Sequence, residues 1–313
     1  MVTTVNMVHD STRGLLRRSI MMAGDARYWP VLRHRPFSWG VRWGANRFIP
    51  WASRTAFSDG IQVLNGIRMV IPRPPDWGGG GEFHMALGTY EHTELQHVLS
   101  RLKPGDGFLD VGAHIGYFSL PVAKLVGADG RVFSVEPWSA SAALLRHNVG
   151  LNGFEHVTVI ESAASDEDGE AAFTVSRLSP MWNTLRHGTL DGETHAVTVK
   201  TRTLDSLMAE HGWPSIAGIK LDVEGAESQV LRGSEQLLNR NPGAFLIFEV
   251  AGGRPERISA SLESLRVLEQ RGYRFSRLGA RGLLHPASVA GLLPSLHSSD
   301  WQESLINLVA ERI

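Results

Sequence analysis

The sequence predicts an α/β fold in which a mostly parallel sheet is covered by helices on both faces. Apolar strand-like segments alternate with helical patterns from Tyr90 to Glu249, and such alternation is typical of parallel βαβ units. A second indication is the segment 108–118, where an apolar strand runs into a glycine loop and then into an apolar helix. The chain of 313 residues is long enough for one large domain of this kind with extensions.

The order of the expected elements follows from these patterns. Strands are expected to end near the residues Val111, Val135, Ile160, Leu221 and Val250. One helix should carry the apolar residues that repeat at helical spacing between Glu94 and Leu102. Further helices are expected after the residues Gly116, Ser139, Thr203 and Glu224. Near the C-terminus, Tyr273–Phe275 and Leu305–Val309 are predicted strands, separated by an excursion that contains Pro and Ser.

An extension precedes the main domain. Residues 1–82 are expected to hold an Arg- and Trp-rich segment and a β-hairpin, whereas residues 83–313 form the main domain with a β-insertion at about 170–200. The hairpin is predicted over 61–71, because Asn65-Gly66 is a strong hairpin turn signal. The run Gly78–Gly81 is interpreted as a hinge or the base of a lid.

The Arg- and Trp-rich segment has several possible roles. Its composition would suit a membrane interface or an anionic carrier. Its Trp side chains could equally pack on the domain or mediate a homo-oligomer contact, with the Arg heads pointing outward. Pro30, Pro36 and Pro50 break any long amphipathic helix. Packing or dimer contact is therefore favoured over membrane association.

The glycine loop is the most informative motif. Asp110 closes an apolar strand, and the glycines follow as Gly112-x-x-x-Gly116. The dinucleotide fingerprint requires three glycines in the pattern G-x-G-x-x-G, which this loop lacks. An acidic loop suits a cofactor with an amine and a sulfonium better than one with a pyrophosphate. The loop therefore predicts S-adenosyl-L-methionine as the cofactor.

Two further turns complete the predicted cofactor site. Glu136-Pro137-Trp138 follows the next strand, and a carboxylate at that position accepts hydrogen bonds from ribose hydroxyls. Trp138 is well placed to stack on the adenine ring. The small residues that follow the third strand, Ser162, Ala163 and Ala164, leave room for a flat ring. The alternative at Glu136 is a strand that merely ends in a solvated carboxylate, and the alternative after the third strand is a helix-capping turn without a ligand.

A third acidic turn follows the strand Ile219–Leu221. Asp222 is placed at the strand end and Glu224 at the start of the next helix, with Glu227 one helical turn further on the same face. Carboxylates also stabilise a helix N-terminus through its dipole, so capping is the alternative. Asp222 and Glu224 are interpreted as site residues, and Glu227 as a supporting or capping residue.

Four segments in this order closely resemble the FkbM family of S-adenosylmethionine-dependent methyltransferases: 88–91 (GTYE), 110–117 (DVGAHIGY), 135–137 (VEP) and 221–227 (LDVEGAE). The resemblance extends over about residues 60 to 250. It implies a Rossmann-like class I methyltransferase fold with a seven-stranded sheet. The implied reaction is O-methylation of a hydroxyl on a sugar, glycoside or other natural product.

The resemblance also implies which residues contact the cofactor. They are Tyr90, Glu91, Asp110, Gly112, Ala113, His114, Gly116, Glu136, Pro137, Trp138, Ser162, Ala163, Ala164 and Asp222. The family usually has Asn where this chain has His114. That departure leaves open whether residue 114 only holds the cofactor or also takes a proton.

Methyl transfer to an alcohol needs a base, because the hydroxyl loses its proton as the new bond forms. A positioned base contributes about 10²–10⁴-fold to the rate. The catalytic candidates are Asp222, Glu224 and His114, with Asp222 or Glu224 favoured over His114; Glu91 and His92 are further candidates. The spacing His92-x-x-x-x-His97 does not place both rings on one helix face, so no metal site is predicted.

The amino-acid composition excludes several classes of partner and binding site. The formal net charge of −1 argues against a dedicated nucleic-acid partner, and the absence of cysteine excludes disulfides and thiolate zinc sites. No secretory signal or transmembrane run is evident, and a cytoplasmic location is expected. Two alternatives remain: an NAD(P)-dependent Rossmann oxidoreductase, and a catalytically silent partner protein that binds S-adenosylmethionine.

Overall fold

The computed structural model describes residues 61–72, 85, 88, 90–176, 185, 194–279 and 282–312. The chain forms two compact units, residues 1–90 and 91–313. The Arg- and Trp-rich segment and the glycine run at 78–81 lie outside the described residues. Their predicted roles therefore stay predictions.

The described part of the first unit is a β-hairpin. Strands β1 (Ile61–Leu64) and β2 (Ile67–Val70) pair antiparallel, with Leu64 opposite Ile67. Asn65 and Gly66 both have positive φ, 51° and 74°, as a two-residue type I′ turn requires. The hairpin predicted from Asn65-Gly66 is confirmed.

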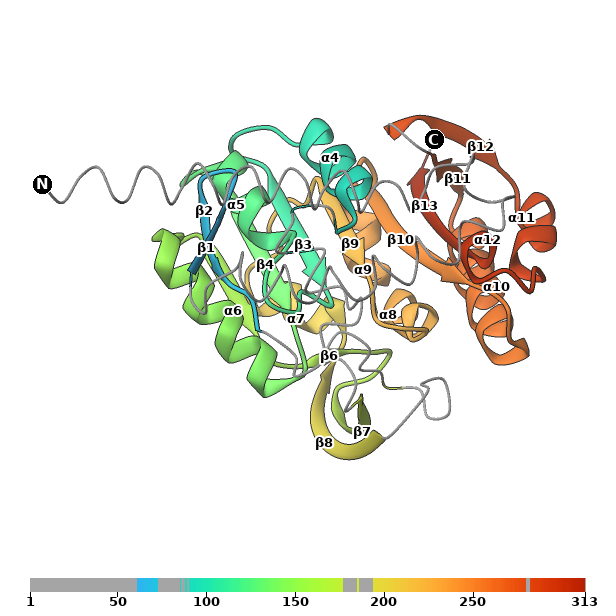
Figure 1. The fold of residues 1–313 in the computed structure, drawn as a ribbon, viewed down its shortest axis with the longest axis horizontal. Helices are drawn as coiled ribbons and strands as arrows, with labels where there is room; N and C mark the ends of the chain where they lie inside the picture. Colours follow the sequence, from blue (N-terminus) through green and yellow to red (C-terminus); the bar gives the residue numbers. More distant parts are fainter. Residues whose placement is uncertain are drawn as a thin grey trace, which may run out of the picture. The chain divides into compact units, whose positions relative to one another are not determined.

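The second unit is built around a large sheet of mixed direction (Figure 1). Its strand order is β12-β11-β13-β10-β9-β3-β4-β5. Five neighbouring strands are parallel: β5 (Val157–Ile160), β4 (Arg131–Val135), β3 (Gly107–Val111), β9 (Gly218–Leu221) and β10 (Phe245–Ala251). Strand β13 (Leu305–Arg312) inserts antiparallel between β10 and β11 (Tyr273–Leu278). The predicted mostly parallel α/β fold is confirmed.

The sheet has one strand more than the seven that the family resemblance implies. The additional strand, β12 (Leu284–Ala287), pairs antiparallel with β11 at the edge of the sheet. It belongs to the C-terminal excursion, which also forms helices α11 (Val289–Leu296) and α12 (Trp301–Ser304). The excursion therefore contains regular structure that its Pro and Ser content did not predict.

Helices cover both faces of the sheet. Apolar residues of five helices form one buried cluster with the strands: α7 (Leu204–Glu210), α8 (Glu227–Arg232), α9 (Glu235–Arg240), α10 (Pro255–Gln270) and α11. The opposite face carries α4 (His92–Arg101), α5 (Ser119–Val126) and α6 (Ser139–Asn152). Among the described residues, no helix is long and apolar enough to span a membrane.

The predicted β-insertion is a small separate sheet in the order β6-β8-β7. Its strands are β6 (Ala163–Ala164), β7 (Gly169–Ser176) and β8 (Thr194–Arg202). The ring of His195 in β8 meets the ring of Trp138 edge-on, with 6.3 Å between their centroids. The insertion therefore reaches the turn that follows β4.

Candidate active site

Strand register brings charged side chains together on the face covered by α4 and α5. Asp110 in β3 lies directly opposite Lys220 in β9, and Lys220 lies opposite Ile247 in β10. Side chains of directly opposed residues point to the same face of a sheet. The alternate residues Leu109, Leu221 and Phe248 belong to the apolar cluster on the other face.

The glycine loop lies directly against the third acidic turn. At Gly112 a β-carbon would stand 1.8 Å from the backbone carbonyl oxygen of Asp222, and φ is +82°. A side chain is therefore excluded both by space and by backbone conformation. The amides of Gly112 and Ala113 donate to the carbonyl of Val135 at 2.9 and 3.1 Å. The loop is thus tied to β4 on one side and to Asp222 on the other.

Glu136 anchors the same loop from the end of β4. One oxygen of its carboxylate accepts the backbone N–H of His114 at 2.9 Å, and the other accepts that of Trp138 at 2.8 Å. The side chain is buried, with 6% exposed, and burial raises its pKa to about 7. Each oxygen can accept one more hydrogen bond.

The residues of this loop region fit an S-adenosylmethionine cofactor. Three buried polar atoms have no hydrogen-bond partner among the described residues: Asp110 Oδ1, His114 Nδ1 and Ser162 Oγ. The other oxygen of Asp110 accepts from Ser119 Oγ at 2.6 Å. Buried polar atoms in proteins normally have partners, so these atoms are suited to the polar groups of a ligand.

The remaining predicted cofactor residues are placed as follows. Ala113 is buried, Gly116 has φ +96°, and Pro137 and Trp138 are half-buried beside Glu136. Ala163 and Ala164 are buried in β6, where they pair with Thr201 and Arg202 of β8. Glu91 precedes α4 with φ +38°. Tyr90 is the last residue of the first unit.

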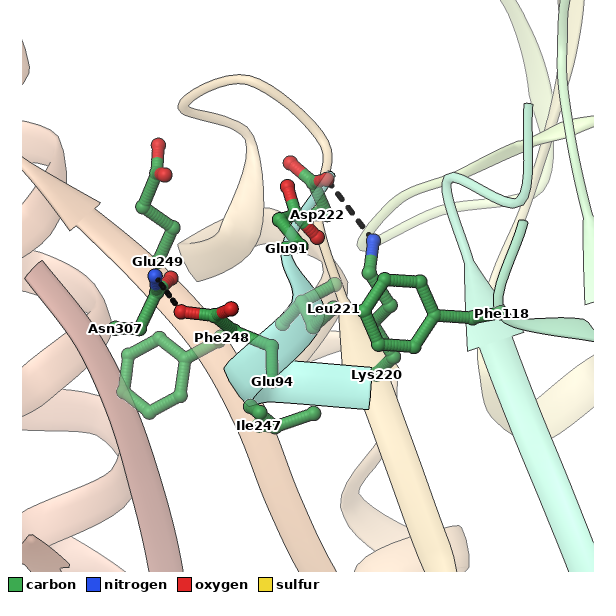
Figure 2. A pocket seen from close by; sticks show the side chains of 10 residues that line it. All are labelled: Glu91, Glu94, Phe118, Lys220, Leu221, Asp222, Ile247, Phe248, Glu249 and Asn307. Atoms are coloured by element: carbon green, nitrogen blue, oxygen red, sulfur yellow. Dashed lines mark hydrogen bonds and ion pairs between the residues drawn. The ribbon is translucent and has the colours of Figure 1, made fainter. Parts of the chain in front are cut away.

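A small pocket, partly open to solvent, lies at the carboxyl ends of β9 and β10. Figure 2 shows the side chains that line it: Glu91, Glu94, Phe118, Lys220, Leu221, Asp222, Ile247, Phe248, Glu249 and Asn307. Two polar pairs hold its sides. Lys220 Nζ lies 2.9 Å from Asp222 Oδ2, and Asn307 Nδ2 donates to Glu94 Oε1 at 2.6 Å.

The sequence prediction for Glu224 was wrong in one respect. Helix α8 begins at Glu227, so Glu224 is not at a helix start, and its φ of 52° is left-handed. Glu224 therefore lies in the turn, and the argument that placed Glu224 and Glu227 on one helix face does not hold. Glu227 Oε1 accepts the backbone N–H groups of Gly225 at 3.0 Å and Val223 at 3.3 Å. It supports the turn, as the supporting interpretation expects, and no side chain caps the start of α8.

The titration behaviour of the candidate bases differs. Burial, with the neighbouring carboxylates of Asp222 and Glu227, raises the pKa of Glu224 to about 8. Burial lowers the pKa of His114 to about 4, so its ring is a weaker base than an ordinary histidine. Of these two groups, Glu224 is therefore the stronger base.

Four polar residues of the pocket were not predicted as site residues from the sequence. Glu249 ends β10, and burial, followed by the carboxylates of Asp222 and Glu224, raises its pKa well above the usual value. The other three are Glu94, Lys220 and Asn307. A charged residue inside an otherwise apolar strand was a usable signal for Lys220 and Glu249. The sequence carried no such signal for Glu94 and Asn307, because these two residues meet only through the insertion of β13 next to β10.

No group of three or more His, Cys, Asp or Glu side chains suited to hold a metal ion is found in the described part of the chain. The arrangement consists of a glycine loop with carboxylates after β3 and β4, and beside it a pocket edged by carboxylates. Such a site on this sheet defines a class I methyltransferase.

The chain belongs to the FkbM methyltransferase family, because the Methyltransferase FkbM domain matches residues 110–275, more than half of its length. The resemblance noted in the sequence is thereby confirmed. The cofactor predicted from the sequence, S-adenosyl-L-methionine, is confirmed together with the family.

Individual relatives are more distant. The 2-O-methyltransferase NoeI of Sinorhizobium fredii is 29% identical over 163 residues, which make up 48% of this chain and 65% of NoeI. Less than two thirds of that protein is thus matched. The FkbM methyltransferase structure from Methylobacillus flagellatus has a TM-score of 0.39 and 17% identity, over 73% of this chain and 53% of that one. The structure of a SAM-dependent methyltransferase from Aquifex aeolicus has a TM-score of 0.39 and 17% sequence identity. The match covers 69% of this chain and 88% of that one.

Proposed function

We propose that the protein methylates a hydroxyl group on a sugar, glycoside or other natural product, and that Asp222 takes the hydroxyl proton. The observation that carries the proposal is the position of Asp222. Its backbone contacts Gly112 of the cofactor loop, and its side chain lines the neighbouring pocket. The name of NoeI, a 2-O-methyltransferase, supports oxygen as the methyl acceptor.

The bound cofactor supplies an electrophilic methyl group on a sulfonium. In this proposal Asp110, Gly112, Gly116 and Glu136 hold the cofactor, while the pocket orients the acceptor. Alignment of the acceptor oxygen with the methyl group supplies several kcal/mol of the rate enhancement. The hydroxyl proton passes to the carboxylate of Asp222. Glu224 is the second candidate for this role, and its raised pKa favours a protonated carboxyl at neutral pH.

Calorimetric titration tests the cofactor side of the proposal. The full chain is titrated with S-adenosylmethionine, S-adenosylhomocysteine and NAD. Micromolar binding of the first two, without binding of NAD, is the expected result. Binding of NAD alone would support an oxidoreductase and would exclude methyl transfer.

An acceptor panel tests the reaction. Methyl pyranosides with a free 2-hydroxyl are incubated with the protein and S-adenosylmethionine, each beside its 2-deoxy and 2-amino counterparts. A mass gain of one methyl group is expected on the hydroxyl compound and not on the 2-deoxy compound. Methylation of the 2-amino compound alone would replace O-methylation by N-methylation. If the cofactor binds and no panel member is methylated, the sugar acceptor is wrong.

A further inference from the structure

Lys220 is the one buried lysine of a chain that uses lysine rarely. Of its 31 Lys and Arg residues, only Lys103, Lys124, Lys200 and Lys220 are lysines. The first three are exposed, whereas Lys220 is 7% exposed, between Ile219 and Leu221 in the buried strand β9. Removing an ammonium group from water is costly unless other groups compensate. The buried ammonium group of Lys220 therefore needs partners that compensate for its loss of water.

Lys220 is surrounded by one carboxylate at ion-pair distance and one aromatic ring. Its Nζ lies 2.9 Å from Asp222 Oδ2 and 4.8 Å from the centre of the Phe118 ring, and an aromatic face attracts a cation. Burial acts to lower the pKa of Lys220, but the carboxylates of Asp222, Glu91 and Asp110 together raise it above its ordinary value. Lys220 thus stays an ammonium. It is also the one cation among the residues that line the pocket in the described part of the chain.

The geometry leaves the two oxygens of Asp222 in different situations. Oδ2 is held by Lys220, whereas Oδ1 has no hydrogen bond to the described residues. The side chain is 28% exposed and lines the pocket. Other carboxyls near the same pocket, Glu91, Glu224 and Glu249, come from three different segments of the chain. Lys220 contacts Asp222 and none of these three at ion-pair distance.

We propose that Lys220 is the positioning residue for Asp222: it holds Oδ2 and leaves Oδ1 to face the acceptor hydroxyl. This inference rests on the proposed function, because it assigns the proton to Asp222. In the reaction the bond between the methyl carbon and sulfur breaks, and its electron pair stays on sulfur as a thioether. The acceptor oxygen forms the new bond to carbon, its proton moves to Oδ1, and Lys220 keeps all its protons.

If Lys220 only stabilised the fold, its substitution would have different effects on Tm and turnover. Replacing both members of a buried ion pair by uncharged residues is often neutral or stabilising. If Lys220 served stability alone, its loss would lower Tm and leave turnover of the folded enzyme unchanged. A positioning role lowers turnover and is cancelled when Asp222 is already gone, because interacting residues are not additive.

The test compares K220M, K220R, D222N and the double variant K220M/D222N in the full chain, with K124M as the exposed control. The acceptor is the pyranoside with the highest turnover in the panel above. K220M is expected to lower kcat about tenfold to a hundredfold, with less than about a threefold change in KM and in cofactor affinity. K220R is expected to recover kcat to within about fivefold of the native enzyme, because the positive charge is kept. The double variant should be no slower than D222N.

Three results would overturn the inference: native kcat in K220M, equal loss in K220R and K220M, or a double variant clearly slower than D222N. Failure of the proposed function looks different, since D222N itself would then keep its turnover. Should K220M fold poorly, the double variant and K220R still decide between the two roles.

A measurement without acceptor completes the test. Ammonium-selective ¹H–¹⁵N spectra of the ¹⁵N-lysine-labelled chain have only four lysines to resolve. One slowly exchanging signal is expected, absent in K220R and shifted or lost in D222N. A Lys220 signal that D222N leaves unchanged would contradict the ion pair and with it the inference.

Discussion

The two halves of the active site hold their carboxylates in different ways. In the cofactor half, after β3 and β4, Glu136 accepts two backbone N–H groups and Asp110 accepts a serine hydroxyl. In the pocket half, after β9 and β10, Asp222 is paired with a lysine, and Glu224 and Glu249 lie among other carboxylates. Backbone amides fix a carboxylate in place, whereas the carboxylates of Asp222 and Glu249 line a pocket that is partly open to solvent. The first half is therefore suited to bind the cofactor, and the second to meet an acceptor.

The largest expected effect separates these two roles. Asp222→Asn should lower kcat by about 10²–10⁴-fold, because the amide cannot take the acceptor proton. Cofactor affinity should change less than about threefold, since the backbone contact to Gly112 is kept. Steady-state kinetics and calorimetry measure the two quantities. Asp129→Asn, an exposed change at the opposite end of the sheet, is the control. Intact turnover in Asp222→Asn would remove Asp222 as the base.

A substitution at Gly112, where the cofactor loop contacts the backbone of Asp222, should also have a large effect. Gly112→Ala places a β-carbon 1.8 Å from the carbonyl oxygen of Asp222 at φ +82°. We expect a loss of about 3 kcal/mol or more in the free energy of unfolding. Gly127→Ala is the matched control, because Gly127 also has positive φ but nothing lies within 4 Å of its β-carbon. It should cost about 1 kcal/mol. Equal values from denaturant titration would show that the contact at Gly112 is not restrictive.

Glu136→Ala should act on the cofactor half alone. It removes the acceptor for two loop amides and for the predicted ribose hydrogen bonds, which should weaken cofactor binding by about 1–3 kcal/mol. Calorimetry measures this loss, and Glu155→Ala, an exposed residue, serves as the control. Unchanged affinity in Glu136→Ala would contradict the placement of the ribose at the end of β4.

The smallest expected effect is on the pH dependence of the melting temperature. Because the pKa of Glu224 is raised to about 8 in the folded chain, the folded state binds more protons than the unfolded state between about pH 4.5 and 8. This group's contribution to stability therefore decreases as pH rises through that window. The protein without ligands should melt lower at about pH 8.5 than at about pH 5.5, and Glu224→Gln should reduce the difference by about 2 °C or more. Glu235→Gln, on exposed α9 surface, should leave the difference unchanged.

Local patterns in the sequence were enough for the strand ends, the hairpin and the cofactor loop. The ends of the five parallel strands were predicted within a residue or two because each apolar run stops at a turn residue. The helix after Asp222 was predicted three residues too early, since Glu224 occurs in both helices and turns. Only the left-handed backbone at Glu224 shows that the turn continues to Ala226.

What the sequence by itself determined is the α/β fold, the family, and the carboxylates that close β3, β4 and β9. Each of these depends on residues that are neighbours along the chain. Tertiary structure alone decided the pocket, because Asn307 meets Glu94 across 213 residues through the insertion of β13 beside β10. Tertiary structure also decided which groups surround Lys220, because Asp110 and Phe118 come from a different βα unit than Asp222. Register and burial give these charges their chemistry, and neither can be read from residue spacing.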